Sequence, residues 1–222
     1  MEEIQQNGQE TKSSQSASPR WKQYALPFAV LIVLVAIGGY WLASSVFGPR
    51  LPVEKEGAPF SFTDIDGQTV TLDNTNGKVR LLYFFFANCP DVCPPTTFLL
   101  SQVQNRLKEI KLFGDDVMIL SVTIDPVRDT PEALREFAGK FDADFAGWKF
   151  LRGEEKATAD LAKDYGILVT KDSEGNFGHM NLIVLLDREG RIRKWISVND
   201  YIQGGDLEGV VNGIVKDVKS LT

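Results

Sequence analysis

A run of 24 residues without a charged side chain, Tyr24–Phe47, constrains this chain more than any other feature of its sequence. At 1.5 Å per residue a helix of this length spans about 36 Å, enough to cross the hydrocarbon core of a bilayer. The run therefore predicts a single transmembrane anchor over residues 23–48. The preceding residues 1–22 are rich in Gln, Ser, Glu and Asn and are predicted to form a disordered tail.

A cleaved signal peptide is the alternative interpretation of this run. A signal peptide has an apolar region of only about 7 to 15 residues followed by small residues, so the length favours a retained anchor. Three basic residues precede the run, Lys12, Arg20 and Lys22, and two follow it, Arg50 and Lys55. This bias predicts a single-pass protein of the cell membrane with a cytoplasmic N-terminus and an extracytoplasmic C-terminal domain.

Residues 51–222 remain for a folded domain, and their number is sufficient for one domain with a sizeable core. Over the whole chain, 24 Lys and Arg stand against 30 Asp and Glu, a formal net charge of -6. Nucleic acid is therefore not an expected partner. The single histidine excludes any metal site that needs two imidazoles from one chain.

The hydrophobic pattern of this domain predicts alternating strands and helices. Residues 60–72 are predicted to form a hairpin around Asp66-Gly67, and residues 181–197 a second hairpin. The remaining predicted elements are buried strands at Arg80–Phe86 and Val117–Ile124 and helices at Thr96–Ile110, from Thr130 to about Phe141, at 155–165 and from about Asp206. This order predicts an α/β domain with a central sheet covered by helices and an N-terminal β-hairpin.

The only two cysteines, Cys89 and Cys93, lie between a predicted buried strand and a predicted helix. Each precedes a proline, which disfavours helical geometry and predicts a loop, with Cys93 at or near the start of the helix and Pro94 in its first turn. The positive end of the helix should lower the pKa of both thiols and favour thiolates. A pair of inert buried thiols, or a short structural disulfide, is the alternative.

Three segments carry a family resemblance: FFFANCPDVCPPTT, IDPVRDTPEALREFA and GHMNLIVLLDREG. Together they are similar to the Sco/SenC family of membrane-anchored copper proteins of cytochrome oxidase assembly. The resemblance covers about residues 50–218, and its C-P-D-V-C-P core is specific. The chain departs from the family pattern at His179, which lies between Gly178 and Met180 instead of Asp and Ser, and this predicts a more mobile loop.

The resemblance implies a thioredoxin-like domain that binds one copper ion through Cys89, Cys93 and His179. Soft thiolates suit Cu(I), and an added imidazole also accommodates Cu(II). Asp125 is expected to lie close to the site and to orient a ligand or tune its basicity, with a simple turn-initiating role before a proline as the alternative. Met180 could offer a thioether, although a core role is favoured. The expected partner is the subunit of cytochrome c oxidase that carries the CuA site.

A thiol-disulfide oxidoreductase is the second function class, since reactive cysteines are common to both. Thioredoxin-type reductants carry a cis-proline where this chain has Gly178, His179 and Met180, and all ten prolines lie at or before Pro131. A histidine in place of the substrate-docking proline favours a copper-binding function. The one enzymatic activity that the sequence leaves as an alternative of this class is thiol-disulfide exchange. A zinc enzyme with two Cys and one His ligand ranks third.

Overall fold

The computed structural model describes residues 22–46, 51–89, 91–173 and 177–222. The contacts divide the chain between residues 49 and 50 into two compact units. The first contains helix α1, Lys22–Val46. Within the described residues, no helix combines the length and the apolar character needed to cross a membrane. The anchor over 23–48 stays a prediction, and the tail predicted over 1–22 lies, except for Lys22, outside the described residues.

The second unit is built on a sheet of eight strands in the order β1-β10-β9-β4-β5-β6-β2-β3. Two further strands, β7 and β8, form a separate antiparallel pair. The strands in chain order are β1 (Lys55–Glu56), β2 (Ser61–Asp64), β3 (Thr69–Thr71), β4 (Val79–Phe85), β5 (Val117–Thr123), β6 (Trp148–Arg152), β7 (Val169–Lys171), β8 (Phe177–His179), β9 (Leu182–Leu186) and β10 (Arg191–Ser197).

The centre of the large sheet consists of β4 and β5, which pair in parallel, with every residue of both strands buried. Strands buried on both faces read as continuous apolar runs, which is why the sequence predicted both of them. β9 pairs antiparallel with the other side of β4, so that β4 has a hydrogen-bonded neighbour on each edge. The two predicted hairpins are also confirmed, as β2–β3 and β9–β10.

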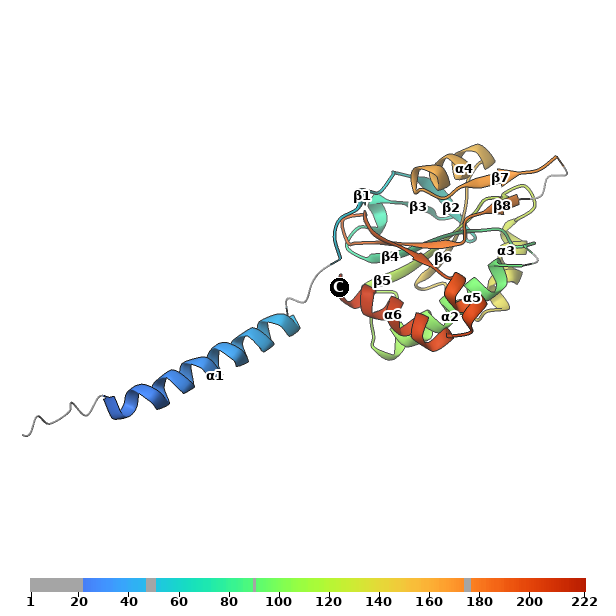
Figure 1. Cartoon of the computed structure of the whole chain (residues 1–222). Coiled ribbons are helices and arrows are strands. Elements are labelled where there is room, and N and C mark those ends of the chain that lie inside the picture. Colours follow the sequence, from blue (N-terminus) through green and yellow to red (C-terminus); the bar gives the residue numbers. More distant parts are fainter. Residues whose placement is uncertain (1–21, 47–50, 90, 174–176) are drawn as a thin grey trace, which may run out of the picture. The chain divides into compact units, whose positions relative to one another are not determined.

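In the described part of the second unit, five α-helices and one short 3-10 helix accompany the strands. They are η1 (Asp73–Thr75), α2 (Cys93–Glu109), α3 (Pro131–Gly139), α4 (Glu155–Asp164), α5 (Asn199–Gly204) and α6 (Leu207–Lys219). Thr130 caps α3 by accepting a hydrogen bond from Ala133, and Asp206 caps α6 through Gly209, as side chains of these types do. Figure 1 shows α2 and α6 on one side of the sheet and α4 on the other. The predicted mixed α/β fold is confirmed.

Candidate metal centre

The two cysteines lie where β4 leads into α2. Past Phe85, the chain turns, with the Cys89 amide donating to the carbonyl of Phe86 at 3.2 Å, and α2 begins at Cys93. Two consecutive prolines follow Cys93 and supply no N–H, which suits the first turn of a helix. Both thiols are free, and their residues are buried, with 8% of Cys89 and 0% of Cys93 exposed.

His179 ends β8, and its half-buried ring faces the start of α2. Its Nε2 lies 3.5 Å from the Sγ of Cys93, and its Nδ1 lies 3.1 Å from the carbonyl oxygen of Met180. Because a carbonyl can only accept, this second contact places the proton on Nδ1 and leaves the Nε2 lone pair directed at Cys93. The rings of Tyr83 and Phe86 contact the imidazole edge-on. The histidine that is distant in sequence is therefore next to one of the two sulfurs.

The two thiols differ in their proton affinity. The pKa of Cys89 is lowered to about 5, chiefly by a hydrogen bond from the Cys93 thiol and further by backbone N–H groups of residues 91–93. The pKa of Cys93 is raised instead, because it is paired with the Cys89 thiolate and buried. The prediction that both pKa values would be lowered is correct for Cys89 and wrong for Cys93. Two adjacent thiols with little access to water cannot both ionise easily, so they share one negative charge.

Burial also lowers the pKa of His179, which outweighs the opposing effects of the Met180 carbonyl and of the Cys89 charge. The imidazole is therefore neutral near pH 7, the state in which it can ligate a metal. Beside it, the phenol oxygen of Tyr83 is buried and has no hydrogen-bond partner among the described residues. The pKa of this phenol is raised, first by burial and then by the neighbouring Cys93 thiol.

Asp125 and Asp129 lie in the loop that follows β5. Asp125 forms an ion pair with Arg128, and its amide donates to the hydroxyl of Thr123 at 3.0 Å. Asp129 is the one that reaches the cysteine loop: its Oδ2 accepts from the Ala87 amide at 3.0 Å and from the Thr123 hydroxyl. Asp129 was not predicted from the sequence, although its position four residues after Asp125, behind a buried strand, could have suggested a pair. The ligand-orienting role expected of Asp125 stays a prediction.

The described residues contain no group of three or more His, Cys, Asp or Glu side chains arranged to hold a metal ion. A pair of donors is nevertheless in place. A thiolate at about 2.3 Å and an imidazole at about 2.0 Å from one tetrahedral metal, the distances known for zinc, lie about 3.5 Å apart. The observed 3.5 Å between Cys93 and His179 matches that separation. The donor set, two sulfurs and one imidazole, fits the soft metal predicted from the sequence.

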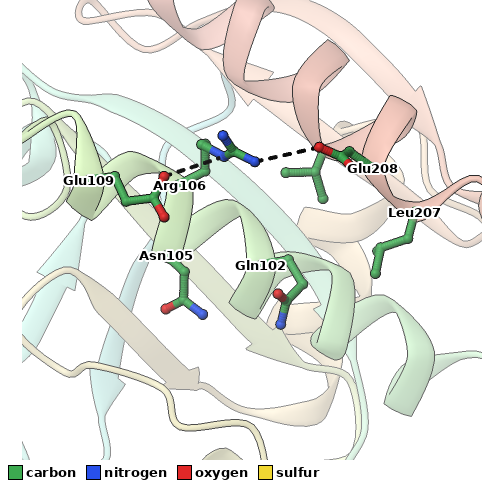
Figure 2. Close-up of a pocket in the computed structure, with 7 residues that line it drawn as sticks. Gln102, Asn105, Arg106, Glu109, Leu207 and Glu208 are labelled. Carbon is green, nitrogen blue, oxygen red and sulfur yellow. Dashed lines mark ion pairs between the residues drawn. The ribbon is translucent and has the colours of Figure 1, made fainter.

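A separate groove between α2 and α6 contains none of the predicted ligands. Its volume is about 280 Å³, and Figure 2 shows Arg106 extending across it between Glu109 and Glu208, at 3.6 and 3.8 Å. The remaining lining residues are Gln102, Asn105, Leu207 and Val211. These exposed ion pairs bring no thiol or imidazole into the groove. The candidate site is therefore the thiol–imidazole cluster and not this groove.

Comparison with known proteins decides the family. The model of the SCO1/SenC family matches residues 49–205, more than half of the chain. This chain belongs to the SCO1/SenC family. The SCO1 protein homolog of Bacillus subtilis is a relative with 30% identity over 198 residues, covering 86% of this chain and 92% of its own.

Two solved Sco structures agree with this assignment. A SCO1/SenC family lipoprotein from Bacillus anthracis has a TM-score of 0.68 at 33% identity, over 78% of this chain and 98% of its own. The copper-bound ScoI of Arabidopsis thaliana has a TM-score of 0.61 at 28% identity, over 73% and 98% of the two chains. The predicted thioredoxin-like α/β fold is thereby confirmed. Proteins of the Sco family bind copper and take part in cytochrome c oxidase assembly.

Proposed function

We propose that this Sco protein binds one copper ion through the thiolates of Cys89 and Cys93 and the imidazole of His179, and that it delivers this copper to the CuA-bearing subunit of cytochrome c oxidase. The observation that carries the proposal is the 3.5 Å approach of His179 Nε2 to Cys93 Sγ, with the lone pair of Nε2 directed at the sulfur. Cys89 joins them as the third ligand, already a thiolate near pH 7.

Copper arrives and leaves as cargo, and this chain supplies the donors. Near pH 7, Cys89 and His179 are ready to bind, whereas Cys93 must lose its proton when the metal enters. The two sulfurs hold Cu(I), and the imidazole also makes Cu(II) acceptable. Three protein ligands leave a coordination position open, through which a partner's ligand can enter and remove the ion by exchange.

An anaerobic copper titration of the reduced protein tests the proposal. We expect one copper ion per chain and, for Cu(II), intense thiolate charge-transfer absorption. His179→Ala should weaken or alter the Cu(II) complex while leaving the fold intact, measured by absorption, electron paramagnetic resonance and circular dichroism. Met180→Ala is the matched control, because it removes an exposed neighbour and the competing thioether ligand. Identical copper binding by wild type and His179→Ala refutes the histidine assignment.

Asp125 is proposed to tune this site from outside the ligand set, through the loop that it shares with Asp129. Asp125→Asn keeps the shape of the side chain and removes the charge that pairs with Arg128. We expect a weaker copper complex with an unchanged ligand set, measured by competition with a chelator. Unchanged affinity reduces Asp125 to a turn residue before Pro126.

A membrane anchor at residues 23–48, with the domain on the extracytoplasmic side, is part of the proposal. Its support is the charge-free run Tyr24–Phe47 and the exposed apolar side chains of α1, such as Val30 and Leu34. In a flotation assay, the full chain should rise with lipid vesicles, and the chain without residues 1–48 should not. Cleavage of the domain by a protease added to the outside of spheroplasts tests the orientation.

Thiol-disulfide exchange is the second candidate function, favoured by the unequal thiols. A low pKa at Cys89 suits an attacking thiolate, and the buried Cys93 suits a resolving thiol. In one cycle the two thiols would become a disulfide, and two electrons and two protons would pass to the partner's disulfide. Reduction of a partner-peptide disulfide, compared among wild type, Cys89→Ser and Cys93→Ser, tests this activity. Negligible turnover by the wild type removes this candidate.

A further inference from the structure

Two side-chain contacts join the segment 179–181 to the first turn of α2. The first is the approach of His179 to Cys93, and the second links Asn181 to Thr96. Cys93 and Thr96 are three residues apart in the helix and so lie on the same face. The histidine segment is therefore attached at two neighbouring points of one helical turn.

The Asn181 side-chain amide contacts the Thr96 hydroxyl through both of its polar atoms. Its Nδ2 donates to Thr96 Oγ1 at 2.9 Å, and its Oδ1 lies 3.1 Å from the same oxygen, whose single proton has the Val92 carbonyl as its nearer acceptor at 2.8 Å. Thr96 is 0% exposed and Asn181 is half-buried. Solvent therefore competes little for this bond, and its loss would leave a buried hydroxyl oxygen without its donor.

Backbone pairing by itself holds the histidine only weakly. β7 and β8 form their own two-stranded sheet, with three paired positions, outside the eight-stranded sheet. Isolated two-stranded pairs are marginally stable in water. The backbone of the segment is tied on by the Met180 amide, which donates to the carbonyl of Leu168, a residue that flanks β7 and not the main sheet. On its other side the segment runs into β9 at Leu182, which anchors the backbone to the main sheet but does not set the orientation of the ring. Side-chain contacts therefore orient the imidazole against α2.

We propose that Asn181, acting through Thr96, is a positioning residue that holds His179 Nε2 opposite Cys93 before copper arrives. The proposal rests on the copper site proposed above and adds to it the contact that orders its imidazole ligand. A ligand held in place before binding loses less conformational freedom when the metal enters and departs less readily afterwards. The hydrogen bond restrains the loop around His179. This loop was predicted to be mobile because Gly178 and Met180 stand where the family has Asp and Ser.

The test compares copper release among variants of the full chain. Thr96→Val removes the acceptor with little change of shape, and Asn181→Ala removes the donor. Thr96→Ser retains the hydroxyl and serves as the rescue. Thr158→Val is the matched control, because Thr158 is another buried helical threonine whose hydroxyl donates to a carbonyl of its own helix, far along the chain from the site.

We expect Thr96→Val and Asn181→Ala to release Cu(II) to a chelator about tenfold faster than wild type and to alter its electron paramagnetic resonance spectrum. Thr96→Ser and Thr158→Val should behave as wild type. In copper-free protein, the imidazole NMR signals of His179 should shift and broaden in the first two variants alone. In a His179→Ala background, Asn181→Ala should have no further effect on release.

The outcomes separate this inference from the proposed function. If wild type and His179→Ala bind copper alike, the proposed ligand set fails, whereas the NMR signals of the copper-free variants still decide whether Asn181 orders the ring. If His179→Ala weakens the complex but Asn181→Ala and Thr96→Val leave both release and the imidazole signals unchanged, the positioning role is wrong. An equal effect of Thr158→Val likewise overturns it, since the change would then reflect general destabilisation.

Discussion

The two halves of the metal centre are built in different ways. Cys89 and Cys93 follow β4, which is buried along its whole length and has hydrogen-bonded strands on both sides. His179 ends β8, a strand of three residues that, among the described residues, pairs only with β7 in a sheet that is separate from the main one. The cysteine half of the site thus continues a central core strand, whereas the histidine half lies between the peripheral β7–β8 pair and the start of β9, and side chains orient its ring.

This difference suits a protein that must take up a metal and also give it up. The sulfurs stay where the core places them, whereas the imidazole can withdraw at the cost of a few peripheral contacts. Local opening requires least free energy where few apolar contacts and short ladders hold a segment. We therefore expect copper to leave through loss of the histidine first, and the following changes test how unequal the two halves are.

The largest expected effect comes from truncating an aromatic ring in each half. Phe85 is fully buried in β4 and stacks on Phe137, whereas Phe177 of β8 is half-buried and contacts Phe86. Phe85→Ala should lower the free energy of unfolding by about 3–5 kcal/mol, because it removes a buried ring and leaves a cavity. Phe177→Ala should lower it by only about 1 kcal/mol.

Urea denaturation followed by near-ultraviolet circular dichroism measures both values. The comparison would be wrong if Phe177→Ala destabilised the domain as much as Phe85→Ala, since β7–β8 would then belong to the same cooperative core. Amide hydrogen exchange provides an independent check. Phe177→Ala should accelerate exchange in β7–β8 and leave β4 and β5 protected.

Removing the Asp129 carboxylate is the second largest change and affects the cysteine half. Asp129→Ala leaves the Ala87 amide and the Thr123 hydroxyl without their acceptor in a buried place. We expect a loss of about 1–3 kcal/mol in the free energy of unfolding, together with a weaker copper complex, measured by denaturation and chelator competition. Asp160→Ala, which removes only an exposed ion pair with Lys156, should leave both nearly unchanged.

The sequence predicted the core half of this molecule better than its periphery. Apolar runs that form central strands carry their own signal, and so do the prolines that place Cys93 at a helix start. β6 was missed because Lys149 and Arg152 interrupt its apolar pattern. In the fold, Lys149 lies 3.4 Å from Asp64 and Arg152 donates to the carbonyl of Pro126, partners that are distant in sequence. β7 and β8 were missed for a related reason, since their pairing is too short to have a periodic pattern.

The candidate site shows the same division between local and tertiary information. Family resemblance selected Cys89, Cys93 and His179, and the fold brings the last two to 3.5 Å from each other. The upward shift of the Cys93 pKa could not be predicted from its position at a helix start, because the shift depends on the Cys89 thiolate and on burial. The link from Asn181 to Thr96 joins residues 85 positions apart, and no local pattern indicates it.

The different pKa values of the two thiols predict that their alkylation rates differ about tenfold. Only thiolates react with iodoacetamide, and the Cys89 pKa of about 5 lies well below the usual value of about 8.5. In reduced, copper-free protein, Cys89 should be alkylated at least about tenfold faster than Cys93 near pH 7. Its rate should be nearly constant from pH 8 down to pH 6 and fall as the pH drops through 5. Mass spectrometry of the two cysteine peptides measures both rates. A Cys89 rate that keeps rising up to pH 9 would show an ordinary thiol and contradict the assigned charge.

The smallest expected effect tests how β7–β8 is held at its outer end. Lys171 of β7 lies over the ring of Phe177 at 4.7 Å and pairs with Glu155 of α4, with both partners partly exposed to solvent. Lys171→Ala removes both contacts and should lower the free energy of opening of the strand pair by about 0.5 kcal/mol. Amide exchange in β7–β8 should then be about two- to threefold faster. Glu155→Gln removes the ion pair alone and should have a smaller effect that disappears at high salt.

If β7–β8 opens separately from the main sheet, amide exchange in β4 and β5 should not change in either variant. Equal acceleration in both sheets would mean that the imidazole and the sulfurs are released only when the whole domain unfolds, and copper transfer would then need a different route.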